Sequence, residues 1–145
     1  MKINKKTSAM WSGGIKDGKG TISTESGALN NQAYGFNTRF EGVKGTNPEE
    51  LIGAAHAGCF TMALSGILGE AKLTATNLNT TAQVSLEKKD NGFEITDIHL
   101  TVKGSIPGTT QAQFQELANK AKINCPVSKL FKANTNITME AMLEV

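Results

Sequence analysis

The chain has 145 residues, of which 39% are hydrophobic and 19% charged, a composition typical of a soluble globular protein with one domain. The formal net charge is +2, and the lysines are scattered without interleaved aromatic residues, which argues against a nucleic-acid-binding function. The first residues lack the apolar stretch of a signal peptide, so we expect a single domain over residues 1–145 that works in the cytoplasm.

The first third of the chain is rich in glycine, serine, threonine and asparagine and predicts short strands joined by turns. We expect three strands, over residues 3–11, 20–24 and 34–40. The segment GGIKDGKG, which starts at Gly13, predicts a turn because glycine and aspartate permit the backbone angles that tight turns require.

The strongest helix signal follows. Asn47 can cap a helix, Pro48 suits its first position, and Glu50 suits its third. An apolar run then extends over residues 51–68, and the small side chains in its middle would let another backbone approach closely. We expect a central helix that is packed on all sides. Its length makes a membrane span worth considering, but His56 and the many small residues argue against one.

The rest of the chain alternates between the periods of strands and helices. In chain order it predicts strand 80–88, a tight turn at Asn91-Gly92, strand 93–103, helix 110–122, a short helical turn 125–131 and strand 135–143. The sequence therefore predicts an α+β fold with mainly antiparallel sheets around a long central helix.

Cys59 and Cys125 are the only cysteines. In a reducing cytoplasm they are inert core thiols, metal ligands or a redox pair, and their number alone favours inert thiols. Cys59 lies inside the predicted helix and would need a nearby cation or hydrogen-bond donors to become a thiolate. Cys125 precedes Pro126 at a helix start, where unpaired N–H groups and the helix dipole stabilise negative charge.

A thiolate that cleaves an O–O bond needs a fixed cation for the charge on the leaving oxygen. Arg39 is the only arginine, although a lone arginine is commonly a surface residue. Glu49 or Glu50 could hold its guanidinium, or both could simply compensate the helix dipole. Because Glu50 suits the capping position, we expect Glu49 to bind Arg39.

The spacing of these residues constrains any shared site. Glu49 and Cys59 are ten positions apart, which separates them by about 15 Å along a straight helix. If Arg39 serves both, the simplest arrangement is two copies of the helix packed antiparallel across a homodimer interface.

We considered a metal site as another use of these thiols. His56 precedes Cys59 by three positions, so a zinc site with Cys125 and a carboxylate is conceivable. No Cys-x-x-Cys or His-x-x-x-His spacing supports it, and we expect neither a metal nor a cofactor. We expect His56 to be a packed, hydrogen-bonded core histidine.

Several segments carry a family resemblance. NPEELIGAAHAGCF at residues 47–60, with CPVS at residues 125–128, strongly resembles the OsmC/Ohr family of osmotically inducible and organic hydroperoxide resistance proteins. KGTISTESG at residues 19–27 and YGFNTRFEG at residues 34–42 resemble the OsmC branch. The resemblance spans nearly the whole chain. It implies an intertwined homodimer with two long central helices and a cysteine-based peroxidase activity that prefers organic hydroperoxides to hydrogen peroxide.

The resemblance also implies roles for single residues. Cys59 resembles the peroxidatic cysteine, Cys125 the resolving cysteine and Glu49 the carboxylate of the site. Arg39 resembles the arginine of the OsmC branch. The Ohr branch takes its arginine from an earlier loop, where this chain has lysines, so a lysine is the alternative cation.

We therefore expect a thiol-dependent peroxidase that reduces organic hydroperoxides through a Cys59 sulfenic acid and a Cys59–Cys125 disulfide. An external dithiol, either a lipoylated protein or a thioredoxin-like protein, would reduce the disulfide. The alternative is a non-enzymatic redox-sensing or small-molecule-binding stress protein with incidental thiols. A metal-dependent hydrolase is a weaker third hypothesis. Neither a nucleic acid nor a membrane is expected as a partner.

Overall fold

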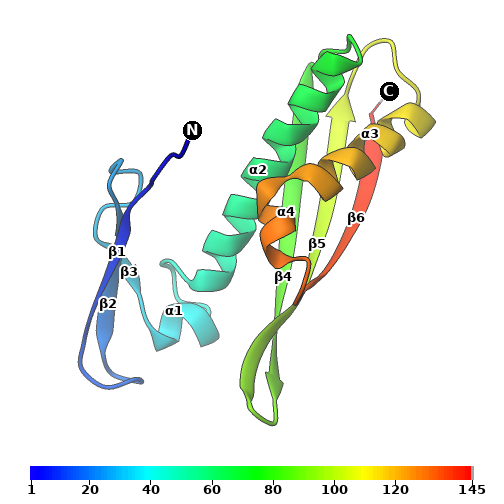
Figure 1. The fold of residues 1–145 in the computed structure, drawn as a ribbon. Helices are drawn as coiled ribbons and strands as arrows, with labels where there is room; N and C mark the ends of the chain where they lie inside the picture. Colours follow the sequence, from blue (N-terminus) through cyan, green and yellow to red (C-terminus); the bar gives the residue numbers. More distant parts are fainter. Residues whose placement is uncertain (145) are drawn as a thin grey trace. The chain divides into compact units, whose positions relative to one another are not determined.

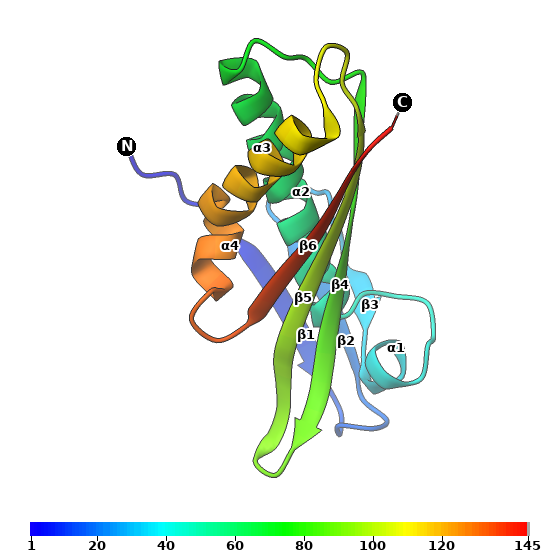
Figure 2. The same cartoon turned by 90° about the vertical axis from the view of Figure 1, so that its right-hand side faces the viewer.

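The computed structural model describes residues 1–144, and the chain divides into two compact units, Met1–Leu51 and Ile52–Val145. Their elements can be followed in Figure 1, and Figure 2 gives a second view. In chain order the elements are β1 (Thr7–Ser12), β2 (Lys19–Thr24), β3 (Gln32–Tyr34), α1 (Phe36–Phe40), α2 (Pro48–Glu70), β4 (Asn77–Lys89), β5 (Gly92–Ser105), α3 (Gln111–Asn124), α4 (Pro126–Phe131) and β6 (Asn136–Leu143). The described residues thus form the predicted α+β fold with two sheets and one long helix.

The first unit is built on an antiparallel sheet in the order β1-β2-β3. Gly20 in the middle strand pairs with Trp11 on one side and Tyr34 on the other. A Cβ atom at Gly20 would lie 2.3 Å from the Tyr34 ring, so glycine is required for the two rings to pack across β2. The ring centroids of Trp11 and Tyr34 are 5.4 Å apart.

The expected strand over residues 34–40 is wrong beyond Tyr34, because Phe36–Phe40 forms the short helix α1. The reason is the side chain of Thr38, which is buried. Its hydroxyl accepts the N–H of Gly35 at 2.8 Å and lies 2.8 Å from the carbonyl oxygen of Thr46, to which it donates. These bonds close a helical turn on a segment whose aromatic residues favour a strand.

Helix α2 begins as predicted. The Glu50 N–H donates to Asn47 Oδ1 at 2.8 Å, and Asn47 Nδ2 donates to Glu50 Oε2 at 2.9 Å, so Asn47 caps the helix. Among the described helices, α2 alone is long and apolar enough to cross a membrane, judged by length and composition. Its residues Phe60, Leu64 and Leu68 are buried in the core, so α2 is a partly buried core helix.

The second unit packs helices against a mixed sheet in the order β4-β5-β6. β4 and β5 form an antiparallel hairpin, whereas β6 runs parallel to β5. A parallel neighbour requires a crossover connection, and α3 followed by α4 supplies it. Figure 1 shows α2, α3 and α4 along one face of this sheet.

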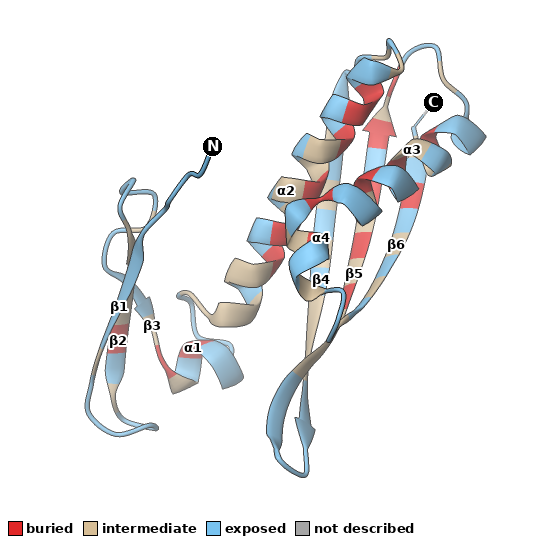
Figure 3. Cartoon of the chain, in the orientation of Figure 1, coloured by how far each residue is buried: buried red, intermediate tan, exposed pale blue. Residues whose placement is uncertain are grey.

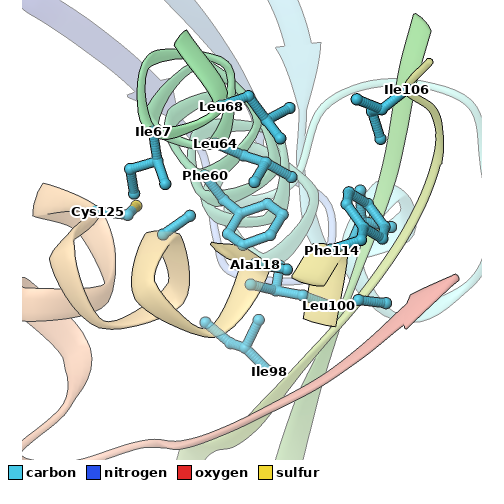
Figure 4. Close-up of a cluster of buried hydrophobic side chains, with 13 residues drawn as sticks. Phe60, Leu64, Ile67, Leu68, Ile98, Leu100, Ile106, Phe114, Ala118 and Cys125 are labelled. Carbon is cyan, nitrogen blue, oxygen red and sulfur yellow. The ribbon is translucent and has the colours of Figure 1, made fainter. Parts of the chain in front are cut away.

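The core of the second unit lies between this sheet and the helices (Figure 4). Alternation along β5 buries Ile98, Leu100 and Val102, as the period of the sequence predicts. From the helices, Phe60 and Phe114 are the largest fully buried side chains. Cys125 belongs to the same buried cluster and has no exposed surface.

The expectation that α2 packs on all sides is wrong for a single chain. One face of the helix is exposed, as the pale blue segments of α2 show in Figure 3. Its residues are Ala54, Ala55, Gly58, Met62, Ser65 and Gly66. We call this set the small-residue face of α2.

Replacing Phe114 by alanine should lower the free energy of unfolding by about 3–5 kcal/mol, because it empties the centre of the second unit's core. Ile123→Ala on the same helix is the matched control, since Ile123 is 69% exposed, and it should change stability by less than about 0.5 kcal/mol. Urea unfolding followed by circular dichroism measures both. Equal losses would contradict the core described here.

Candidate active site

The two cysteines come together in the second unit. Cys59 lies in the middle of α2 and is partly exposed, whereas Cys125 ends α3 and caps α4. Both are reduced, and their side chains form a hydrogen bond. This pairing could be predicted only from the family resemblance, because nothing local to either residue indicates it.

The surroundings of Cys59 oppose the thiolate. Burial raises the pKa of Cys59, and the hydrogen bond with Cys125 and the repulsion between two thiolates raise the pKa further. The backbone N–H of Val127 donates to Cys59 and acts in the opposite direction. No lysine or arginine among residues 1–144 contributes to this shift. The thiol of a single chain is therefore protonated near neutral pH.

The bond from Val127 corrects one sequence-based expectation. We expected the N–H groups at the start of α4 to stabilise charge on Cys125. The second residue of that helix instead donates its N–H to Cys59, across from α4 to α2. Sequence periodicity cannot reveal a backbone bond between two helices.

His56 precedes Cys59 by three positions on α2 and is fully buried. Its Nε2 is 2.7 Å from the hydroxyl oxygen of Ser128, which is also buried. Burial lowers the pKa of His56, so the imidazole is neutral at neutral pH. His56 is thus a packed, hydrogen-bonded core histidine. Its Nδ1 has no hydrogen-bond partner within residues 1–144.

Arg39 and Glu49 form an ion pair in the first unit. Arg39 Nη2 donates to Glu49 Oε1 at 2.6 Å, and Arg39 Nε donates to both carboxylate oxygens at 3.1 and 3.2 Å. The Arg39 side chain is 35% exposed and that of Glu49 13%. The fork geometry fixes the guanidinium plane. As expected, Glu50 is engaged with Asn47, which leaves Glu49 for Arg39.

Two of the predicted site residues, Glu49 and Cys59, lie on one helix but far apart along its axis. Glu49 is in the first turn of α2, and Cys59 stands ten positions further on, about 15 Å along the axis. Over residues 1–144, no group of three or more His, Cys, Asp or Glu side chains is arranged so that it could hold a metal ion.

Comparison with known proteins identifies relatives over the whole chain. The family model described as OsmC-like protein matches residues 41–140. The chain is 59% identical over 144 residues to the peroxiredoxin OsmC of Escherichia coli strain K12, which covers 99% of both proteins. It is 33% identical over 123 residues to the organic hydroperoxide resistance protein OhrB of Bacillus subtilis strain 168, which covers 83% of this chain and 88% of that protein.

Solved structures agree with the fold. The crystal structure of OhrB from Bacillus subtilis superposes with a TM-score of 0.71 at 29% identity and covers 94% of this chain and 97% of that one. An OsmC-like protein from Mycoplasma pneumoniae gives a TM-score of 0.80 over 100% of both chains at 15% identity, a likeness of fold alone.

Replacing Cys125 by alanine should lower the pKa of Cys59, because both effects of Cys125 raise it. Cys59 in the variant should then react faster with iodoacetamide between pH 7 and pH 9 than Cys59 in wild type, by about tenfold for each unit of pKa. Cys125→Ser is the matched control, since its hydroxyl keeps a hydrogen-bonding group and should give an intermediate rate. Peptide mass mapping assigns the alkylated residue. Equal Cys59 rates in wild type and Cys125→Ala would show that the thiols do not interact.

Proposed function

This chain belongs to the OsmC-like protein family, and from that membership we propose that it is a cysteine-based peroxidase that reduces organic hydroperoxides to alcohols. The peroxidase class is confirmed by the 59% identity with a protein named peroxiredoxin OsmC. More distant relatives are named for organic hydroperoxide resistance, which supports that class of substrate. The observation that carries the proposal is the hydrogen bond between the reduced thiols of Cys59 and Cys125.

The reaction has two chemical steps before reduction. The Cys59 thiolate attacks one peroxide oxygen; an S–O bond forms, the O–O bond breaks, and the leaving alkoxide takes a proton to become the alcohol. Cys59 is then a sulfenic acid. Cys125 attacks its sulfur, an S–S bond forms, and hydroxide leaves with the proton of Cys125 as water.

The burial of the two cysteines supports this division of roles. Cys59 is partly exposed, so a peroxide can reach its sulfur. Cys125 has no exposed surface and contacts Cys59, so it is suited to resolve the sulfenic acid rather than to meet substrate. An external dithiol, either a lipoylated protein or a thioredoxin-like protein, then attacks the accessible Cys59 sulfur of the disulfide and releases Cys125 as a thiol.

Arg39 is the cation that the reaction requires. Its guanidinium donates three hydrogen bonds to the carboxylate of Glu49, and Nη1 has no acceptor among residues 1–144. Placed beside Cys59, a planar, permanently charged donor of this kind would lower the pKa of the thiol and stabilise charge on the leaving oxygen. Glu49 acts on the reaction through Arg39 and is a positioning residue.

The working molecule is a homodimer in which α2 helices meet. Among residues 1–144 of one chain no lysine or arginine contributes to the pKa of Cys59, and α2 presents its small-residue face to solvent, with Met62 79% exposed. A groove of about 650 Å³ runs beside that face and is lined on the other side by β4. Antiparallel packing of two α2 helices would cover the small-residue face and the groove. It would also place the start of one helix at the middle of the other. Cys59 would then meet Arg39 of the partner subunit.

The remaining assignments follow from the family. The match to the peroxiredoxin OsmC of Escherichia coli covers 99% of this chain, which supports one OsmC-like domain over residues 1–145 made of both units. The reduced thiols suit the cytoplasm. The peroxidase needs no metal or cofactor, because both electrons come from the cysteine pair.

Stopped-flow mixing of wild type with cumene hydroperoxide should show rapid consumption of one equivalent. Cys59→Ser should lose this phase entirely, because serine is not ionised and cannot be oxidised by the peroxide. Cys125→Ser is the matched control and should still consume its first equivalent. If wild type and Cys59→Ser consumed peroxide at one slow rate, the protein would be a non-enzymatic sensor or binding protein.

A mixing experiment tests the shared site. Arg39→Met alone should slow peroxide reduction by about 10²–10³-fold, as loss of one charged donor commonly does. In a dimer of one Arg39→Met and one Cys59→Ser chain, one site is wild type and the other carries both changes. An equal mixture of the two inactive variants, unfolded and refolded together, should therefore regain about a quarter of wild-type activity.

Separately refolded variants that are then pooled provide the control for this mixture. No recovery on joint refolding, although mixed dimers are present by mass spectrometry, would show that each site belongs to a single chain.

A further inference from the structure

His56 and Ser128 join the two helices that carry the cysteines. His56 precedes Cys59 by three positions on α2, and Ser128 follows Cys125 by three positions on α4. The distance from His56 Nε2 to Ser128 Oγ is 2.7 Å. Among residues 1–144 it is the only hydrogen bond that joins a side chain of α2 to a side chain of α4. The bond therefore lies one helical turn from each sulfur.

Burying an imidazole at this position costs free energy, because one of its ring nitrogens loses its hydrogen bond to water. His56 is fully buried and satisfies one ring nitrogen only, since Nδ1 has no partner within residues 1–144. A buried unpaired donor is rarer in proteins than an unpaired acceptor. The favoured tautomer therefore carries its proton on Nε2, which donates to Ser128 Oγ. An apolar side chain would fill the same space without an unpaired nitrogen, so packing alone does not explain His56.

Helix α4 needs such a contact. It has six residues, Pro126–Phe131, and a helix of that length is unstable without tertiary contacts. Its capping residue, Cys125, makes no side-chain capping bond. Phe131 packs its ring edge against His56 with centroids 6.0 Å apart, so the same imidazole contacts α4 at both its first and its last turn.

The first turn of α4 also serves the reaction. Val127, whose N–H donates to Cys59, is the neighbour of Ser128 in that turn. Cys125 begins the turn and lies against Cys59. A small displacement of this turn from α2 would therefore weaken the bond from Val127 and separate the two sulfurs at once.

We propose that the His56–Ser128 hydrogen bond is a positioning device for the peroxidase reaction, holding the first turn of α4 on α2 so that Val127 N–H and the Cys125 sulfur both stay at Cys59. This rests on the function proposed above. His56 and Ser128 touch no reacting atom; they act through Cys125 and Val127. Their effect falls on the speed with which the Cys59 sulfenic acid is captured, which decides whether it becomes a disulfide or is oxidised further.

The test uses full-length protein with His56→Leu and Ser128→Ala, each compared with a conservative variant that retains a hydrogen-bonding group. His56→Gln keeps an N–H near the position of Nε2, and Ser128→Thr keeps the hydroxyl. After one equivalent of cumene hydroperoxide, trapping with dimedone measures the fraction of sulfenic acid that escapes capture by Cys125. Both disruptive variants should slow disulfide formation by about tenfold, and the double variant should be no slower than either single one. The conservative variants should recover most of the rate.

Gln111→Ala separates positioning from general stability. Gln111 bonds α3 to β6 through Ala141 and Leu143, away from the thiols, so its loss should lower the melting temperature without changing the trapped fraction. If His56→Leu and Ser128→Ala also lowered only the melting temperature, the proposed role would be overturned.

A second readout distinguishes failure of this proposal from failure of the proposed function. In a Cys125→Ser background, loss of the His56–Ser128 hydrogen bond should weaken the Val127 bond and raise the pKa of Cys59, which thiolate absorbance at 240 nm measures. If wild type were inactive but these variants still lowered the thiolate absorbance of Cys59, the peroxidase function would be rejected, whereas the positioning of α4 by the His56–Ser128 hydrogen bond would stand. If wild type were active, and if His56→Leu and Ser128→Ala changed neither the capture rate nor the thiolate absorbance, the positioning role of the His56–Ser128 hydrogen bond alone would be rejected.

Discussion

The hydrogen bond between the thiols of Cys59 and Cys125 is the contact on which the candidate site depends. It joins a segment near the start of the second unit to one in its last quarter, and it exists only because α3 and α4 pack against α2. Two neutral thiols are easily buried side by side, whereas two thiolates would repel. Cys125 therefore raises the pKa of Cys59 while it stands next to the sulfur that it would join in a disulfide.

The same contact bears on the reactivity of Cys59 in a single chain. Burial and Cys125 both raise the pKa of Cys59, and the N–H of Val127 offsets them only in part. In the function that we propose, the Arg39–Glu49 ion pair supplies the fixed cation that the attacking thiolate needs. In the homodimer that we propose, the thiol would ionise only in the completed site, which would protect the resting protein from unselective oxidation.

Much of this arrangement could be predicted from local sequence signals. Asn47 and Pro48 predict the start of α2. Glu50 exchanges hydrogen bonds with the capping residue Asn47, and Glu49 therefore remains to bind Arg39, as the structure shows. The strand over residues 34–40 was wrong because one hydroxyl, that of Thr38, reverses the preference of its neighbours. The contacts of Cys59 with Val127, and of His56 with Ser128, join segments far apart in the chain. No periodicity encodes them, so only the packed structure reveals them.

The most direct test of the cysteine pair is the intact mass of the protein after one equivalent of cumene hydroperoxide, with free thiols alkylated under denaturing conditions. The disulfide predicts a wild-type mass lower by two hydrogen atoms and no alkylated cysteine. The Cys125→Ser variant should instead hold a sulfenic acid at Cys59 that dimedone traps. A wild-type protein that keeps its mass and both alkylatable thiols, with the peroxide unconsumed, would contradict the account.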